Sequence, residues 1–332
     1  MDFENISSIY RSAMDRGSSQ EGRAAAPIDI VPDTVQVESR PTGEEASHDH
    51  IGLEVEFEVK VEGDALPPIR VINFRHFQQR TSFPRYPEDK DLCVDVTTVD
   101  RSRAFIVFIS HCWLRGYREA PGWDGRPHPD NATHDKFKLC VEGIERTMKY
   151  LAPGAEECFV WLDFGCMDQD GNPAGELKQL DEIVRHSDCI FTPIHGENRN
   201  TATTINNLYD DYHASAWNEG PYSYTQRGWC RVEMLYAANI PLMEDRARAE
   251  QCFAAGLRYH VLNGVRPHLL YGTSESKGRV SPKILPPLQH SYYWKLNPLE
   301  GHLSVASDRE KINQLYEALK PYLDRKSTRL NS

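Results

Sequence analysis

An unbroken apolar run that ends abruptly in hydrogen-bonding and reactive side chains is the feature that most constrains how this chain can fold. Residues 105–109 read Phe-Ile-Val-Phe-Ile, and they are followed directly by Ser110, His111, Cys112 and Trp113. A short run of this kind is typical of a strand buried on both faces, as in a parallel sheet covered by helices. Ligands of open α/β sheets bind beyond the carboxyl ends of the strands. We therefore expect the four residues after the run to lie on the ligand side of a sheet.

The same layout recurs twice further along the chain. Residues 158–162 are apolar and end at Asp163, and a third apolar run covers residues 189–194. Apolar residues at helical spacing separate the three runs. Such a strand–helix–strand series predicts an α/β domain with a parallel sheet and crossover helices. Two further strands are expected after the third run, at Leu257–Leu262 and at His268–Tyr271.

The first hundred residues differ from this core. Residues 1–50 have little periodicity and many small and polar residues, which predicts a disordered tail. In residues 51–62 apolar and charged residues alternate, which predicts a half-buried strand with its glutamates facing solvent. A second strand is expected at Ile69–Phe74, so residues 51–100 are predicted to form a β-hairpin and an irregular extension, with residues 77–96 as the irregular connection.

The core domain is expected to span residues 101–275, followed by a proline-rich wrap and a helix in residues 276–325. This helix is predicted to begin at Ser307 and to have an apolar face formed by Ile312, Leu315, Leu319 and Tyr322. Residues 326–332 show no packing pattern and are predicted to be a second disordered tail.

The composition excludes several classes of function. The net charge is −11, from 38 basic and 49 acidic residues, which argues against a general nucleic-acid-binding surface. No apolar run approaches the roughly 20 residues needed to span a bilayer, and the N-terminus has no secretory pattern. Eight cysteines in 332 residues, mostly within apolar patterns, are typical of free buried thiols in a reducing compartment. We therefore expect a cytoplasmic protein with no nucleic-acid or membrane partner.

Thiol and imidazole groups near the strand ends leave two other kinds of chemistry open. His111, Cys112, Cys166 and Cys230 are of the ligand types that zinc prefers, although no CxxC or HxxxH spacing accompanies them. Cys112 beside His111 is a candidate nucleophile, although adjacent strand residues point to opposite faces. The acidic turn at residues 168–171 is not a calcium loop, because a thiol would occupy its first ligand position. Neither alternative is favoured, and no metal site is predicted.

The segment from Arg227 to Glu233, Arg-Gly-Trp-Cys-Arg-Val-Glu, is the sharpest local feature. Gly228 permits a tight entry into a helix, and Trp229 and Glu233 lie four residues apart, so both are expected on one helical face. A carboxylate on such a face is costly to leave unpaired. We expect that Arg227 or Arg231 neutralises Glu233, or that Glu233 serves a ligand.

Four blocks, in the same order as in a known family, combine these observations. They are Phe105–Trp113, Val160–Asp163, Ser187–Pro193 and Arg227–Met234, spread over about residues 101–275. Together they resemble the Toll/interleukin receptor (TIR) family, whose opening strand, second and third strands and Trp-Cys-x-x-Glu helix start have similar patterns. The long loops at residues 114–131 and 195–226 depart from the family pattern.

The resemblance implies a flavodoxin-like parallel sheet of about five strands with helices on both faces. It also implies one of two functions. Many TIR domains cleave the bond between nicotinamide and ribose in NAD with a glutamate of that helix, which here is Glu233. Others only self-associate, or assemble with other TIR-like domains, as signalling adaptors. NAD would be a substrate, and no cofactor is expected.

The chemistry of NAD cleavage suits a single carboxylate. Nicotinamide is already a cationic leaving group and needs no general acid, and the transition state resembles an oxocarbenium ion. A carboxylate at Glu233 can stabilise that charge. The strand ends place Ser110, His111, Trp113 and Asp163 on the same side of the sheet, so they are predicted to line the cleft. Trp113 or Trp229 is a candidate to stack on the nicotinamide or on a base, and either is equally a candidate for the core.

Overall fold

The computed structural model describes the chain from Leu66 onward, apart from several loop segments. The described residues are 66–116, 122–171, 173–194, 224, 227–243, 246–255, 257–258, 264, 266–274, 278–279, 283–285, 297–303 and 306–330. The predicted tail of residues 1–50, the predicted strand at residues 51–62 and most of the loop at residues 195–226 lie outside them.

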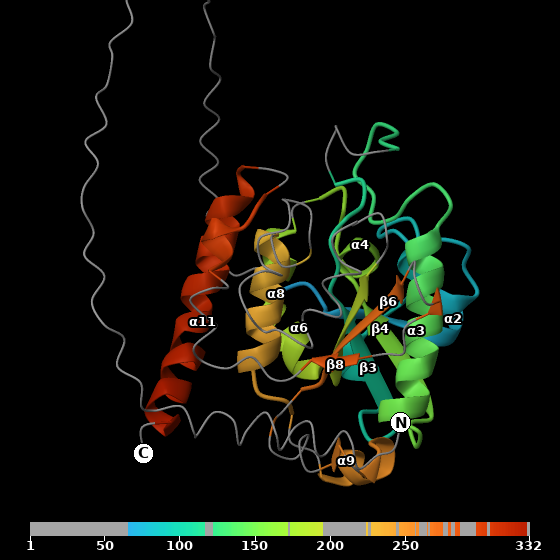
Figure 1. The fold of residues 1–332 in the computed structure, drawn as a ribbon, viewed down its shortest axis with the longest axis vertical. Coiled ribbons are helices and arrows are strands. Elements are labelled where there is room, and N and C mark those ends of the chain that lie inside the picture. Colours follow the sequence, from blue (N-terminus) through green and yellow to red (C-terminus); the bar gives the residue numbers. More distant parts are fainter. Residues whose placement is uncertain are drawn as a thin grey trace, which may run out of the picture. The chain divides into compact units, whose positions relative to one another are not determined.

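One sheet forms the centre of the described fold (Figure 1). Its strands are β1 (Arg70–Asn73), β2 (Cys93–Asp95), β3 (Ala104–Ile109), β4 (Glu157–Trp161), β5 (Cys189–Ile194), β6 (His268–Ser274), β7 (Gly278–Arg279) and β8 (Lys283–Leu285). The spatial order is β2-β1-β4-β3-β5-β6-β7, with β8 also paired to β6. β3, β4, β5 and β6 run parallel, whereas β1, β2, β7 and β8 pair antiparallel.

The parallel part of the sheet confirms the predicted α/β class. The first strand of this part, β3, lies between the second and the third, β4 and β5, and β6 follows β5. The resulting order 2-1-3-4 is the flavodoxin-like order as far as it extends. All six residues of β3 are buried, as expected for a strand covered on both faces.

Helices cover both faces of this sheet (Figure 1). The α-helices of the described chain are α2 (Phe74–Gln78), α3 (Asp135–Leu151), α4 (Asp163–Cys166), α5 (Ala174–Leu177), α6 (Leu180–His186), α8 (Gly228–Asn239), α9 (Arg246–Cys252) and α11 (Asp308–Leu330). The chain moves from β3 to β4 in one direction and from β4 back past β3 to β5 in the other. Because crossovers are right-handed, α3 and α6 fall on opposite faces. α3 contacts β5 and β6, α6 contacts α8, and α11 packs on α8.

Glycines at points of close contact determine how two of these helices, α3 and α8, pack against their neighbours. In α3, a Cβ on Gly143 would lie 2.4 Å from the Phe191 ring and 2.6 Å from the Tyr271 ring. At the start of α8, Gly228 lies against Gly301, whose added Cβ would be 2.4 Å from the Gly228 Cα. The Gly228 N–H also donates to the carbonyl of His302 at 3.0 Å. The tight entry expected at Gly228 is therefore a contact with the segment that precedes α11.

A buried carboxylate ties the amino end of β5 to β3. Asp188 is fully buried and accepts a hydrogen bond from the Ile106 N–H at 2.7 Å. It also pairs with Arg101 at 2.9 Å and with Arg248 of α9. Because a buried charge is tolerated only when it is paired and hydrogen-bonded, Asp188 fixes the register of these segments.

The structure corrects several predicted boundaries. Leu257 is helical, not the start of a strand, and the fourth parallel strand is β6. The connection predicted to be irregular, residues 77–96, contains β2 and a 3-10 helix, Lys90–Leu92, and a second 3-10 helix, Val96–Thr98, begins at its last residue. The expected strand at Ile69–Phe74 is present as β1, and among the described residues it pairs with β2 and β4.

The C-terminal helix forms as predicted but extends further. α11 buries Ile312, Leu315 and Leu319, with Tyr322 half-buried, and it continues to Leu330 past the expected end at residue 325. A further 3-10 helix, Pro298–Glu300, precedes it. None of the helices in the described part of the chain combines the length and the apolar character needed to cross a bilayer.

Candidate functional site

The structure brings Ser110 and Glu233 into direct contact. Ser110 follows the last residue of β3 and is fully buried, and its Oγ donates a short hydrogen bond to Glu233 Oε2 in the second turn of α8. The Tyr224 hydroxyl lies 2.5 Å from the same Oγ. Ser110 is thus the point at which the central strand, α8 and the segment before α8 meet, at the carboxyl end of the sheet.

Glu233 has an unusual electrostatic environment. Burial raises its pKa from 4.5 to about 8, and the nearby charge of Asp163 acts in the same direction, against the hydrogen bond from Ser110. Within the described residues no ion pair joins Glu233 to Arg227 or to Arg231. The Arg231 guanidinium donates to the Asn297 carbonyl at 2.9 Å. These contacts therefore do not support the predicted alternative in which Arg227 or Arg231 neutralises Glu233.

Asp163 gathers two of the other predicted cleft residues. His111 Nε2 lies 3.1 Å from Asp163 Oδ1, and the Trp113 indole N–H donates to Asp163 Oδ2 at 2.8 Å. Asp163 itself follows β4 and begins α4. Burial acts to raise its pKa, but the contacts with His111, with Trp113 and with the Phe164 N–H outweigh burial and hold the pKa below its usual range.

His111 is neutral in this arrangement. It is buried, and burial lowers its pKa, an effect to which the positive charge of Lys136 adds and which the contact with Asp163 only partly opposes. Its Nδ1 has no hydrogen-bond partner among the described residues, so Nε2 carries the proton and donates to Asp163. The ring stacks on Phe83 at 5.8 Å between centroids. His111 therefore positions Asp163 and is not accessible as a base.

The two tryptophans have different roles. Trp113 is half-buried beside Asp163 and packs edge-on against Phe164 at 5.4 Å. The Trp229 indole N–H instead donates to Asp308 Oδ2 of α11 at 3.0 Å. Trp229 therefore joins α8 to α11 and is removed from the predicted cleft residues, while Trp113 stays among them.

The structure does not favour the metal and thiol alternatives. Among the described residues no group of three or more His, Cys, Asp or Glu side chains is arranged to hold a metal ion. All eight cysteines are described, and none of them forms a disulfide. Burial raises the pKa of the Cys230 thiol well above its usual range, and Cys112 is only 6% exposed. A buried thiol of this kind is a poor nucleophile.

Three polar residues of the site, Tyr224, Thr192 and His268, were not predicted from the sequence. Tyr224 is fully buried and belongs to a segment where it is one of several scattered tyrosines, so nothing marks it out. Thr192 is a polar residue within an apolar strand, a pattern that could have marked it as a candidate site residue. Its Oγ1 lies 2.9 Å from His268 Nε2 on the neighbouring strand β6.

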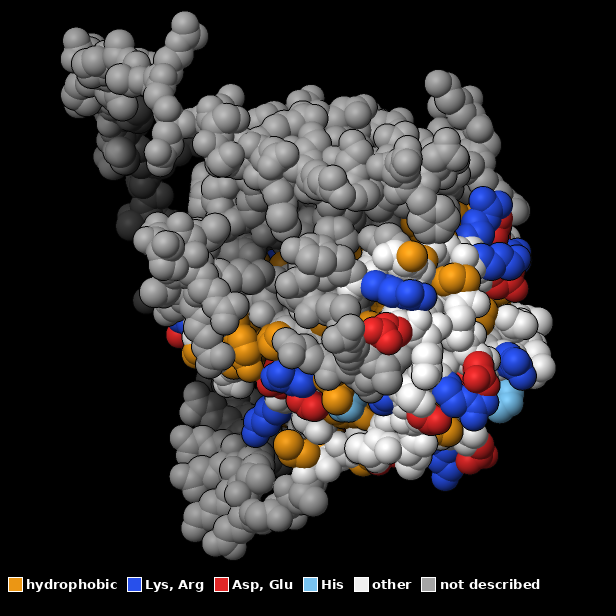
Figure 2. Space-filling model, turned by 90° about the horizontal axis from the view of Figure 1, so that it is seen from below, with side chains coloured by type: hydrophobic (Ala, Val, Ile, Leu, Met, Phe, Trp, Pro, Cys, Tyr) orange, Lys and Arg blue, Asp and Glu red, His pale blue; other side chains and the backbone are white. Residues whose placement is uncertain are grey.

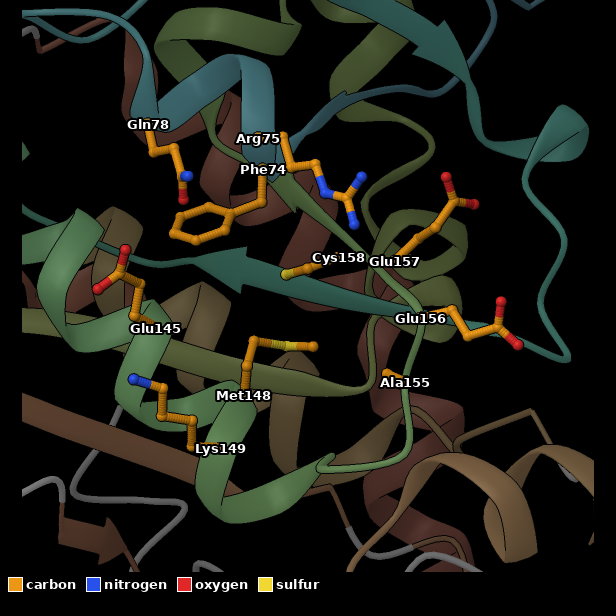
Figure 3. Close-up of a pocket in the computed structure, with 10 residues that line it drawn as sticks. All are labelled: Phe74, Arg75, Gln78, Glu145, Met148, Lys149, Ala155, Glu156, Glu157 and Cys158. Carbon is orange, nitrogen blue, oxygen red and sulfur yellow. The ribbon is translucent and has the colours of Figure 1, made fainter.

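A separate pocket of about 350 Å³ lies at the other end of the sheet. Figure 3 shows its lining, which comes from α2, α3, the start of β4 and the two residues before β4: Phe74, Arg75, Gln78, Glu145, Met148, Lys149, Ala155, Glu156, Glu157 and Cys158. On the face seen from below the view of Figure 1, acidic and basic side chains are interspersed (Figure 2). The pocket holds none of the predicted site residues, so we place the candidate site at the carboxyl end.

No family model, no curated protein and no solved structure matches this chain. The candidate site is therefore assigned from its geometry.

Proposed function

We propose that the protein is a TIR-like NAD glycohydrolase in which Glu233 is the catalytic carboxylate. The observation that carries the proposal is the position of Glu233 at the carboxyl end of β3, bonded to Ser110 and near a second carboxylate, Asp163. No arginine neutralises Glu233 within the described residues. Two carboxyl groups without a bound counter-ion favour a cationic ligand, and the nicotinamide ring of NAD carries a positive charge.

The reaction needs little beyond this arrangement. The bond between ribose C1′ and the nicotinamide nitrogen breaks, and its electron pair moves to that nitrogen, which neutralises the ring. The positive charge passes to the ribose as an oxocarbenium ion, which the Glu233 carboxylate stabilises. Water then forms a bond to C1′ and gives up a proton, which Glu233 is placed to accept. The products are nicotinamide, ADP-ribose and a proton.

The raised pKa of Glu233 sets the pH dependence of this reaction. In the free protein the carboxyl is mostly protonated at pH 7, because its pKa is about 8. A cationic nicotinamide ring bound close by favours the ionised form and lowers that pKa. The free protein is therefore expected to bind and cleave NAD better as the pH rises from 6 to 8.5.

The remaining cleft residues have supporting roles in the proposal. Ser110 orients the carboxylate through its hydrogen bond, and His111 fixes Asp163. Trp113 is half-buried beside Asp163 and is the residue we propose to stack on the nicotinamide or on a base. The Glu233 Oε1 atom accepts no hydrogen bond from the described residues, which leaves it for the ribose hydroxyls.

We further propose a signalling or defence role in the cytoplasm. Eight cysteines without a disulfide among them support a reducing compartment. The net charge of −11 supports the absence of a nucleic-acid partner. Self-association, or assembly with other TIR-like domains, is proposed as the way in which activity is controlled, on the strength of the family resemblance alone.

The experiment that tests the proposal compares three proteins. Wild type, Glu233→Gln and the surface control Glu310→Gln are incubated with NAD at high protein concentration, and free nicotinamide is measured. Wild type and Glu310→Gln should release nicotinamide, and Glu233→Gln should release at least a hundredfold less, a difference of about 2.7 kcal/mol in activation free energy. If no protein releases nicotinamide while wild type oligomerises in size-exclusion chromatography, the adaptor function replaces the enzymatic one.

A further inference from the structure

Hydrogen bonds between hydroxyl groups form a chain that ends at the Glu233 carboxylate. Ser110 Oγ donates to Glu233 Oε2 and lies 2.5 Å from Tyr224 Oη. A serine hydroxyl has one proton, so a Ser110 that donates to the carboxylate must accept from Tyr224. The donor direction therefore runs from Tyr224 through Ser110 to Glu233.

The chain continues on the neighbouring strands. Burial raises the pKa of Tyr224, and interactions with the Ser110 and Thr192 side chains act against that increase. Thr192 Oγ1 lies 2.9 Å from His268 Nε2. Burial lowers the pKa of His268 to about 3, so the imidazole is neutral and its Nε2–H is suited to donate to Thr192. Tyr224 thus lies between Ser110, which follows β3, and the hydrogen-bonded pair of Thr192 on β5 and His268 on β6.

We propose that Tyr224 is a positioning residue, which holds the Ser110 hydroxyl turned toward Glu233 and so stabilises the ionised carboxylate. The proposal deepens the function assigned above and rests on it for its catalytic consequence. With Oε2 held by Ser110, Oε1 is the oxygen presented to the substrate. Tyr224 has no direct contact with the carboxylate and acts only through Ser110.

The effect follows from the difference between charged and neutral hydrogen bonds. A hydrogen bond to an ionised carboxylate is roughly twice as strong as one to a neutral carboxyl, and a donor further along the chain strengthens it. When Glu233 is protonated, the same hydroxyls turn the other way and form weaker bonds. Removing the Tyr224 hydroxyl therefore costs the ionised form more than the protonated form.

The other groups near Glu233 do not mask this effect. Among the described residues, those that face it and titrate are Asp163 at the end of β4, Cys230 on α8, and Tyr224. Contacts with His111 and Trp113 keep Asp163 ionised, whereas burial keeps Cys230 and Tyr224 protonated at neutral pH. A change in the titration of Glu233 on loss of the Tyr224 hydroxyl is therefore assigned to that hydroxyl.

The test is a titration of the Glu233 carboxyl carbon by NMR in the full-length protein, with Glu233→Gln to assign the resonance. Tyr224→Phe is expected to raise the midpoint by about 0.5 pH unit, and Ser110→Ala by about 1 pH unit. Thr192→Val, which acts on the same chain further out, should raise it by less. Tyr236→Phe is the matched control, because the Tyr236 hydroxyl donates to the Leu315 carbonyl at 2.8 Å.

The control should leave the Glu233 midpoint unchanged. If Tyr224→Phe and Thr192→Val both leave the midpoint within 0.1 pH unit of wild type, or if Tyr236→Phe moves it as far, the positioning role is overturned. Nicotinamide release gives the second readout: because kcat/KM reports the ionisation of the free protein, Tyr224→Phe should lower kcat/KM about threefold at pH 6.5, and the loss should shrink to about 1.2-fold near pH 9. A shifted midpoint in a protein that never releases nicotinamide supports the positioning role and overturns only the proposed enzymatic function.

Discussion

Replacing Glu233 by Gln should make the protein relatively more stable as the pH rises. Burial raises the pKa of this carboxyl from 4.5 to about 8, so in that interval the folded protein keeps a proton that the unfolded chain releases. The stability linked to this proton is fully present below about pH 4.5 and is lost as the pH rises through 8. Glutamine has no such proton, so only the wild type loses this stability as the pH rises.

The size of the effect follows from the shift. Each pKa unit corresponds to about 1.4 kcal/mol, so the full shift corresponds to about 5 kcal/mol, an upper value because the side chain is partly exposed. Between pH 6 and pH 8 we expect the free energy of unfolding of wild type to fall by roughly 2 kcal/mol relative to Glu233→Gln.

Urea unfolding at four pH values between 5.5 and 8.5 measures the difference between the two proteins. Subtraction removes the contribution of every other titrating group, and Glu310→Gln, exposed on α11, serves as the control that should show no trend. A difference between wild type and Glu233→Gln that stays constant within about 0.5 kcal/mol would show that the carboxyl titrates normally. The electrostatic description of the site would then be wrong.

Three further outcomes are expected. Gly143→Ala should lower the free energy of unfolding by about 1–3 kcal/mol in urea, because its Cβ would overlap the Phe191 and Tyr271 rings, and an unchanged midpoint would refute this packing. Trp113→Ala should reduce nicotinamide release at least tenfold, whereas Trp229→Phe, which loses only the bond to Asp308, should stay within about twofold of wild type; the reverse order would restore Trp229 to the cleft. The protein should not bind DNA or RNA below about 1 μM in a gel-shift assay at physiological salt, given its net charge of −11, and tighter binding would contradict the exclusion.

The parallel core was predictable because its signal is local. The run at residues 105–109 has the composition of a strand buried on both faces, and it is the central strand of the parallel part. The rule that ligands meet the carboxyl ends of strands then placed Ser110 and Asp163 near Glu233 correctly. The structure adds what spacing does not encode, namely that Ser110 bonds Glu233 directly and that burial changes its pKa.

The differences between the predicted and the observed arrangement come from contacts distant in sequence. Trp229 shares a helix with Glu233, but its indole faces Asp308, which lies 79 residues further along the chain. Leu257 begins an apolar stretch that reads equally as strand or helix, and the helical choice depends on packing that the stretch alone does not specify. Tyr224 was one aromatic residue among several until the fold brought it to Ser110.

The initial rate of nicotinamide release from NAD, measured for wild type and Glu233→Gln between pH 6 and pH 9, tests the central claim most directly. We expect the wild-type kcat/KM to rise with pH, to be half-maximal near the pKa of about 8 and to level off above it, with the Gln variant at background throughout. A wild-type rate equal to that of Glu233→Gln at every pH would contradict the assignment of Glu233 as the catalytic carboxylate.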